Sequence, residues 1–209
     1  MVRNIRGTSS RLTWALWTLL ALAGCALPQD SSPPQQAYLL EVGAFTPPPA
    51  PARRSSRKIL LVTVSREAAG FDSNRIAYTR EPPKLNYYQD SVWSDTPAKM
   101  LLPILVRAFE SSGAFKAVVS PPSPVLADRR VDVDVIRLQQ EFMMTPSRVR
   151  LTVRIKVVEM KNGHVLETRL FEALEPAPSE NAAGAARAAN AAVQKVLSEM
   201  VPFALRTLS

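Results

Sequence analysis

Hydrophobic and polar residues alternate most regularly over residues 148–157, where every odd position is aliphatic and every even position is polar. A period of two predicts a β-strand with one buried face and one solvated face. Residues 131–135 alternate in the same way, and the change of phase at Ile136 predicts a β-bulge. The Asn-Gly pair at 162–163 predicts a two-residue turn from the long strand into another strand over 165–174. Together these segments predict an antiparallel meander.

Shorter apolar runs predict the remaining strands of the sheet. They are rich in β-branched, aliphatic or aromatic residues and are bounded by proline, glycine or polar residues, as is typical of strands. The runs cover residues 38–42, 59–64 and 115–119, and a hairpin covers 75–93 with its turn at Pro82-Pro83.

Two segments carry apolar residues at helical spacing. The first covers residues 97–112, and Asp95 or Thr96 can accept the free N–H groups of its first turn. Pro103 lies inside this pattern and predicts a bend within one helix, because proline removes a backbone hydrogen bond. The second segment is rich in alanine and covers residues 180–205.

The predicted elements indicate the α/β class. We expect a single layered domain with a mixed, largely antiparallel sheet and two main helices packed on it. The apolar stripes that would face the sheet are Met100, Leu101, Ile104, Leu105, Ala108 and Phe109 in the first helix and Val193, Val196, Leu197, Met200 and Val201 in the second.

The first 24 residues have the composition of a secretory signal peptide. Arg3, Arg6 and Arg11 make the start basic, and apolar residues dominate positions 12–22. This apolar run is about half the roughly 20 residues that a membrane-spanning helix needs, so we expect a cleaved peptide rather than a retained anchor helix.

The single cysteine closes the signal peptide in a pattern that resembles a bacterial lipobox. The pattern consists of Leu22, Ala23, Gly24 and Cys25. The resemblance implies that Cys25 receives an S-diacylglycerol group and, after cleavage, an N-acyl chain such as palmitate. More than one acyl chain makes a durable membrane anchor. By resemblance to enterobacterial lipoproteins, Ala26 at the next position favours the outer membrane.

The chain therefore divides into a signal peptide (1–24), a lipidated N-terminus with a tether (25–37) and an α/β lipoprotein domain (38–209). A loop rich in proline and arginine covers residues 46–58 inside the domain. The basic cluster of this loop is typical of a solvated linker. The same cluster could contact anionic lipid headgroups or the phosphates of lipopolysaccharide.

The composition disfavours an enzyme. The chain has one cysteine, one histidine and seven glycines among 209 residues. These numbers disfavour an internal disulfide, a thiolate zinc cluster, a histidine-rich metal site and a glycine-rich phosphate loop. We expect no catalytic residue, no metal ion and no cofactor other than covalent lipid. The chain has 26 lysines and arginines against 18 acids, but cleavage of the signal peptide would remove three of the arginines. Because the mature protein would be less basic and would be exported, we expect no nucleic-acid binding.

Acidic and basic residues occupy neighbouring strands of the predicted meander. Asp132 and Asp134 share one face, which is a feature of some metal or paired-carboxylate sites. We favour another interpretation, in which they pair with basic residues of the next strand, because cross-strand pairs of opposite charge are common in sheets. His164 follows the turn and is typical of a solvated turn residue. The basic residues are Arg148, Arg150, Arg154 and Lys156.

The same four basic residues are candidate contacts with a partner. Like charges on one face repel one another, so they require the two aspartates, a neighbouring subunit, an anionic lipid or a partner protein. Tyr87, Tyr88 and Trp93 are further candidates, because amphipathic aromatic residues are enriched at interfaces. Packing in the core or at the edge of the sheet is the simpler interpretation of these aromatic residues.

Several short motifs follow one another in a characteristic order. After the lipobox come Tyr38-Leu39-Leu40, the strand over 59–64, Arg75-Ile76-Ala77-Tyr78, Leu85-Asn86-Tyr87-Tyr88, Trp93-Ser94-Asp95-Thr96-Pro97 and a helix that ends at Gly113-Ala114-Phe115. This order is similar to that of the ABC-type transport auxiliary lipoprotein family, which includes paraquat-inducible protein C and YmbA-like proteins. The resemblance is strongest over residues 38–119.

The family resemblance implies a non-enzymatic lipoprotein that faces the periplasm from the outer membrane. Members work with ABC transporter components and substrate-binding proteins of the mammalian-cell-entry (MCE) type, in systems thought to move lipids between the inner and outer membranes. They can form homo-oligomeric rings. These properties imply a docking role for this chain.

An outer-membrane lipoprotein that activates a peptidoglycan synthase is the alternative function. Such activators also combine a lipid anchor, a tether and a compact α/β domain. They usually need a long tether to cross the cell wall, whereas residues 26–37 span at most roughly 40 Å when extended. The short tether favours a partner that comes close to the membrane.

Overall fold

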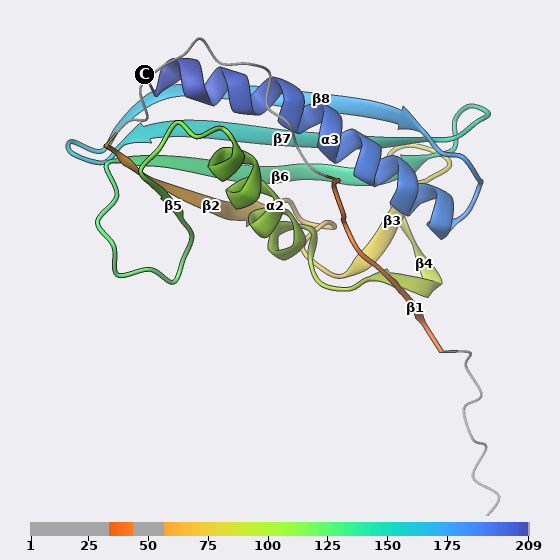
Figure 1. Ribbon diagram of the computed structural model, residues 1–209. Helices are drawn as coiled ribbons and strands as arrows, with labels where there is room; N and C mark the ends of the chain where they lie inside the picture. Colours follow the sequence, from red (N-terminus) through yellow and green to blue (C-terminus); the bar gives the residue numbers. More distant parts are fainter. Residues whose placement is uncertain (1–33, 44–56, 209) are drawn as a thin grey trace, which may run out of the picture. The chain divides into compact units, whose positions relative to one another are not determined.

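A sheet of eight strands with two helices against it makes up the computed structural model, which describes residues 34–43 and 57–208 (Figure 1). The two helices and the mixed sheet confirm the expected α/β class. The strands are β1 (Gln36–Tyr38), β2 (Ile59–Glu67), β3 (Arg75–Thr79), β4 (Asn86–Trp93), β5 (Ala117–Val119), β6 (Arg129–Glu141), β7 (Arg148–Glu159) and β8 (His164–Pro176), and the helices are α2 (Pro97–Ser111) and α3 (Ala182–Thr207).

The strand β6 is the centre of the sheet. On one side it pairs antiparallel with β7, which pairs antiparallel with β8. On the other side β2 and β3 follow one another along β6, both parallel to it: residues 60–67 pair with 129–135, and residues 77–79 pair with 139–141. The sheet continues from β2 to β5 and from β3 through β4 to β1.

The meander of β6, β7 and β8 follows the alternation in the sequence. In β7, the odd-numbered residues from Val149 to Val157 are at most 2% exposed. The expected bulge is present in β6, where the register shifts between Val135 and Arg137. Because the bulge adds one residue, the even-numbered residues Leu138 and Gln140 face the helices after it.

The connection between β7 and β8 is longer than the two-residue turn that the sequence predicts. It comprises residues 160–163, because Glu159 and His164 form the last pair of the ladder. Gly163 has a φ of +72°, and its N–H donates to the carbonyl oxygen of Glu159 at 3.0 Å. Asn162 Oδ1 accepts the N–H of His164 at 3.0 Å. The Asn-Gly pair therefore closes a four-residue turn.

The first strand lies earlier in the chain than the apolar run over 38–42 predicts. β1 covers Gln36–Tyr38 and so includes two residues that the sequence placed in the tether. After Tyr38 the chain leaves the sheet, and Leu40 packs in the core, where it is only 5% exposed. The N–H of Glu41 donates to Asn190 Oδ1 of α3 at 2.9 Å, so this segment is tied to a helix rather than to a strand.

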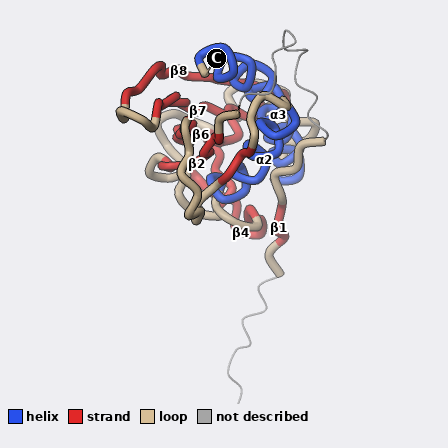
Figure 2. Tube along the Cα trace, turned by 60° about the vertical axis from the view of Figure 1, so that its left-hand side comes forward, coloured by secondary structure: helices blue, strands red, loops and turns tan. Residues whose placement is uncertain are grey.

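Both helices lie against the same face of the sheet, and Figure 2 shows the strands on one side of them (Figures 1 and 2). The expected apolar stripe of α3 is fully buried, and that of α2 is buried except for the half-buried Ile104. Pro103 is exposed and lies inside α2, which remains one helix as expected. The core of the protein therefore lies between the sheet and these two helices.

The N-termini of the two helices are capped by different means. At the start of α3 the Asn181 side chain accepts an N–H of the first turn at 2.9 Å. At the start of α2, Thr96 is the N-cap residue, but its side chain makes no capping hydrogen bond. Asp95 Oδ1 accepts the N–H of Thr96 at 2.8 Å, and Glu67 Oε1 from β2 accepts the N–H of Ala98 at 2.6 Å. The Glu67 carboxylate also suits the positive end of the helix dipole.

The core joins residues from every part of the layered fold. Its largest fully buried side chains include Phe109, Leu60, Ile76, Leu151, Ile155, Leu197 and Met200. The rings of Phe171 in β8 and Phe203 in α3 meet edge to face, with centroids 5.5 Å apart. Within the described residues, the helices are too short or too polar to span a membrane.

Candidate functional site

The predicted lipidation site lies outside the residues that the structure describes. It consists of Leu22, Ala23, Gly24 and Cys25, and residues 46–56 of the proline- and arginine-rich loop also lie outside. Acylation of Cys25 therefore stays a prediction. The predicted partner contacts lie in the described part, on β4 and β7.

The basic residues of β7 lie on the face of the sheet that carries no helix, which we call the open face. The odd-numbered residues of β7 are buried under the helices, so the even-numbered ones project to the other side. The predicted basic residues there are Arg148, Arg150, Arg154 and Lys156, and the acids opposite or near them on β6 and β8 are Asp132, Asp134, Glu141 and Glu172.

Arg150 is paired with acids on both neighbouring strands. Its Nε lies 2.7 Å from Glu141 Oε1, and its Nη1 lies 2.6 Å from Glu172 Oε1. Burial raises the pKa of Glu141, but hydrogen bonds from Arg150 and Gln139 outweigh burial and hold this pKa below its ordinary value. The hydrogen bond to Glu141 in turn raises the pKa of Arg150. Arg150 is therefore engaged within the sheet.

The two aspartates of β6 are neutralised by different residues. Asp134 Oδ2 lies 3.0 Å from Lys156 Nζ, which confirms the expected pairing with the next strand. Asp132 instead accepts the Thr63 hydroxyl at 2.6 Å and lies 2.9 Å from Arg130 Nε on its own strand. The sequence does not show that β2 lies beside Asp132. In the part of the chain that the structure describes, no group of three or more His, Cys, Asp or Glu is placed to hold a metal ion.

Arg148 and Arg154 of β7 lie opposite acids that form ion pairs with other residues. Glu141 is the register partner of Arg148, but it pairs with Arg150. Asp134 is the register partner of Arg154, but it pairs with Lys156. Arg154 is exposed and Arg148 is half-buried, and neither forms an ion pair with another described residue. These two cations of β7 are therefore available on the open face to an acidic partner.

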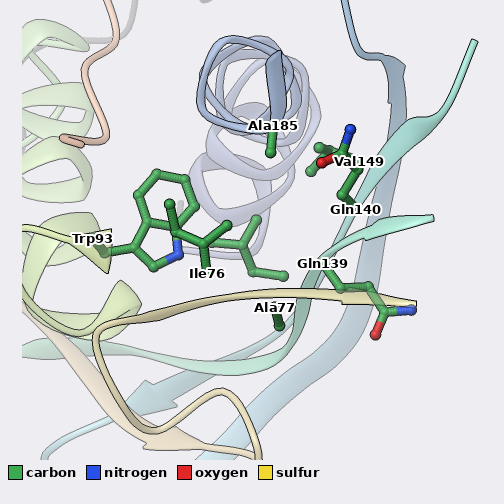
Figure 3. A pocket seen from close by; sticks show the side chains of 8 residues that line it. Ile76, Ala77, Trp93, Gln139, Gln140, Val149 and Ala185 are labelled. Atoms are coloured by element: carbon green, nitrogen blue, oxygen red, sulfur yellow. The ribbon is translucent and has the colours of Figure 1, made fainter. Parts of the chain in front are cut away.

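The aromatic residues of β4 do not form one contact patch. Trp93 is 2% exposed and points toward Ile76 in the core, so the structure corrects its assignment as a partner contact (Figure 3). Its position near the end of β4 places it under the helices. Tyr87 is half-buried: its hydroxyl donates to the Gly70 carbonyl oxygen at 3.1 Å, and the Arg75 guanidinium lies 3.8 Å from its ring centroid.

Tyr88 belongs to a buried polar network that the sequence did not reveal. Its hydroxyl donates to Gln140 Oε1 at 2.7 Å, and Gln140 Nε2 donates to Ser147 Oγ at 2.7 Å. Gln140 and Ser147 are 0% exposed, and the Ser147 N–H donates to Glu180 Oε1 at 2.9 Å. Burial raises the pKa of Tyr88 to about 12. The bulge in β6 turns Gln140 toward the interior. The change of phase at Ile136 was therefore the one feature of the sequence that could have indicated a buried Gln140.

Exposed apolar side chains in the connections between strands were also missed. Leu126, between β5 and β6, is 93% exposed, and Met143 and Met144, between β6 and β7, are 49% and 48% exposed. Apolar residues in loops have no periodicity, so their exposure is visible only in the structure.

Small gaps lie between interior side chains of the described residues, and we consider two of them. Figure 3 shows Trp93, Ile76, Val149 and Ala185 around the first gap, below the start of α3. The second is lined by apolar side chains of α2, α3, β6 and β7. Neither has room for more than a water-sized molecule, so neither is a site for a lipid chain.

Solved structures share this fold. A crystal structure of a Xanthomonas campestris protein of family DUF330 is 28% identical, with a TM-score of 0.74, and the match covers 82% of this chain and 95% of that one. A structure described only as an uncharacterized protein is 12% identical, with a TM-score of 0.62, and covers 84% of this chain and 99% of that one. The hypothetical protein CT253 of Chlamydia trachomatis is 9% identical, with a TM-score of 0.51, and covers 73% and 98%. The last two matches show the fold alone.

The sequence also matches a family model over most of its length. Comparison with curated proteins gave no match. The family model covers residues 38–201, from the end of β1 into the last third of α3. The chain therefore belongs to the family of ABC-type transport auxiliary lipoprotein components.

Proposed function

We propose that the mature protein is an outer-membrane lipoprotein that faces the periplasm and acts as a non-enzymatic docking component of a lipid transport system. The system would contain an ABC transporter and an MCE-type substrate-binding protein. The observation that carries the proposal is the family match over residues 38–201, which follows the predicted tether. The lipobox-like pattern that ends at Cys25 supports the membrane anchor, and Ala26 after it supports the outer membrane.

The open face supports the docking role. It presents Arg148 and Arg154 on β7, which pairs with a strand on each side, and the acids opposite them on β6 pair with other residues. An acidic surface on the MCE-type protein or the transporter would neutralise these cations. Complementary charges of this kind speed association and orient the partners without requiring any chemistry.

A charge-reversal experiment tests the partner and the face together. Tagged, acylated protein is cross-linked in intact cells, purified and examined by mass spectrometry. We expect MCE-type or ABC transporter components with the wild type and about tenfold less of them with Arg148→Glu/Arg154→Glu, because reversed charges repel an acidic surface. Arg107→Glu, exposed on α2 in the other layer, is the matched control and should keep full recovery.

The same experiment separates the alternatives. Recovery of a peptidoglycan synthase without any transporter component would overturn the transport proposal in favour of a synthase activator. Equal recovery by the double variant and the Arg107→Glu control would exclude the open face as the docking surface. We also propose a homo-oligomeric ring, and native mass spectrometry of the acylated protein in detergent would contradict it by showing only monomers.

A further inference from the structure

Exposed apolar side chains gather at one end of the sheet. Nine large hydrophobic residues are exposed in the described part of the chain, and five of them belong to the β5–β6 connection or to the turn and first residues of β8. We call these five residues the apolar tip: Val125 (44% exposed), Leu126 (93%), Met160 (36%), Val165 (56%) and Leu166 (41%).

Backbone hydrogen bonds join the segments of the apolar tip. The N–H of Met160, in the β7–β8 turn, donates to the carbonyl oxygen of Asp128, in the β5–β6 connection, at 3.1 Å. The carboxylate of Asp128 accepts the N–H of Ile59 at 2.7 Å, which ties the same connection to the start of β2. Figure 1 shows the loop after β5 and the turn between β7 and β8 at the same end of the sheet. The segments that carry the five tip residues are therefore adjacent.

The surroundings of the apolar tip are basic. Arg57 precedes β2, Lys116 precedes β5 and Lys161 lies in the β7–β8 turn, and all three are exposed. The N–H of Lys116 donates to the carbonyl oxygen of residue 58 at 3.0 Å, so Lys116 and Arg57 lie on adjoining segments. The acids nearest the tip accept hydrogen bonds or form an ion pair: Asp128 accepts a backbone N–H, Glu159 pairs with a neighbouring arginine of β6, and Glu167 accepts the hydroxyl of Thr207.

We propose that the apolar tip inserts into the headgroup region of a membrane that contains anionic phospholipid. Apolar side chains beside lysine and arginine are the pattern of proteins that bind at the membrane interface, where each cation near an anionic surface adds attraction. The three cations come from three different segments, which suits a surface of repeated negative charges better than a single carboxylate. Pro121, Pro122 and Pro124 restrict the loop that carries Leu126.

The inference concerns a second membrane contact, distinct from the acyl chains of Cys25. It rests on described residues alone, and it holds whether or not the proposed transport partner is correct. Leu126 would lose most exposed area on insertion, so its substitution should weaken binding most.

A fluorescent probe tests insertion directly. The mature chain with Cys25→Ser cannot be acylated and has no other cysteine. Leu126→Cys in this chain is labelled with the environment-sensitive dye NBD and mixed with vesicles of phosphatidylglycerol and phosphatidylethanolamine. We expect a blue-shifted, brighter emission that vesicles of phosphatidylcholine do not produce. Met143→Cys, 49% exposed beyond the other end of β6, is the matched control and should show no change.

Binding itself is measured by sedimentation with the same vesicles. Leu126→Asp should weaken binding about tenfold, because it removes one buried leucine and adds a negative charge. Leu170→Asp, which alters a 55% exposed leucine of β8 outside the tip, should weaken binding less than twofold. Both positions are at the surface, so both variants should fold.

Three results would overturn the proposal. The first is an NBD emission spectrum at position 126 that anionic vesicles do not change. An equal change in the spectra of the probes at positions 126 and 143 would count in the same way. The second is equal vesicle binding by Leu126→Asp and Leu170→Asp. The third is sedimentation velocity without vesicles in which Leu126→Asp turns a dimer into a monomer, since the tip would then cover a second copy of the chain.

Discussion

At the scale of single residues, Gln140 shows how a buried polar side chain joins β4 to the connection between β6 and β7. It accepts the hydroxyl of Tyr88 and donates to the hydroxyl of Ser147, and its exposure is 0%. Gln140→Ala would leave both hydroxyl groups without this partner and open a cavity, so we expect the free energy of unfolding to fall by about 3 kcal/mol. Urea denaturation measures this change.

The neighbouring residue provides the control for this prediction. Gln139 projects to the open face, is half-buried and donates to Glu141 Oε1 at 3.0 Å. Gln139→Ala should lower the free energy of unfolding by less than about 1 kcal/mol. Equal losses for the two alanine variants would show that the buried network contributes no more than a surface hydrogen bond.

Tyr88 predicts a dependence of stability on pH. Burial raises the pKa of Tyr88 in the folded protein from 10.0 to about 12. Between these values the unfolded chain loses its proton first, so the stability that Tyr88 contributes is present below pH 10 and is lost as the pH rises toward 12. The difference in free energy of unfolding between the wild type and Tyr88→Phe should therefore shrink over this range. Urea denaturation from pH 9 upward measures it, and a constant difference would contradict the prediction.

At the same scale, the sequence predicted part of the candidate site. The alternation of β7 placed four basic residues on one face, and the structure agrees. For Trp93 the structure supports the simpler of the two interpretations, packing in the core, because its side chain is only 2% exposed. The pairs of Arg150 and Lys156 depend on which acids β6 and β8 bring near them.

At the scale of elements, the start of α3 depends on one glycine. Alanine is normally the better helix former by about 1 kcal/mol. At Gly184, however, an added Cβ would lie 1.9 Å from the carbonyl oxygen of Ser179. Gly184→Ala should therefore lower the free energy of unfolding by about 3 kcal/mol, because the backbone before the helix would have to move. Thermal or urea denaturation measures this loss.

Gly43 is the matched control for Gly184. A Cβ built at Gly43 meets no atom within 4 Å. Gly43→Ala should change the free energy of unfolding by no more than about 0.5 kcal/mol. If both variants were equally stable, the close contact between Ser179 and α3 would not exist in solution.

Elements with long, regular patterns were predicted well, and short ones were not. β7 and both helices follow patterns of ten residues or more, and the regular alternation of residues 131–135 was enough to locate the bulge in β6. β1 was predicted to begin two residues late, because the apolar run over 38–42 was interpreted as a strand. Leu40 in this run packs in the core and does not pair in the sheet. The cap that Glu67 supplies to α2 joins residues 31 positions apart, so no local pattern could indicate it.

At the scale of the whole molecule, the proposed acylation of Cys25 would decide where the protein resides. Cys25→Ser removes the thiol that the predicted lipidation requires. We expect the variant to be released from membranes or to accumulate as the uncleaved precursor, since the acyl chains supply the durable attachment. Fractionation followed by mass spectrometry of the N-terminus measures both outcomes. A variant that is unmodified and still fully retained at the membrane would contradict the prediction.

The sequence by itself determined the class of the fold, the two helices, the meander and the face on which the basic residues of β7 lie. These features are local, because apolar residues spaced with a period of 2 or 3.6 residues indicate which side chains share one face of a strand or a helix. Tertiary structure alone decided that β2 and β3 follow one another along β6, that Trp93 is buried and Leu126 exposed, and that Arg148 and Arg154 lack an acidic partner among the described residues. The physical reason is that burial and ion pairing depend on neighbours distant in the chain, and only the folded arrangement brings those neighbours together.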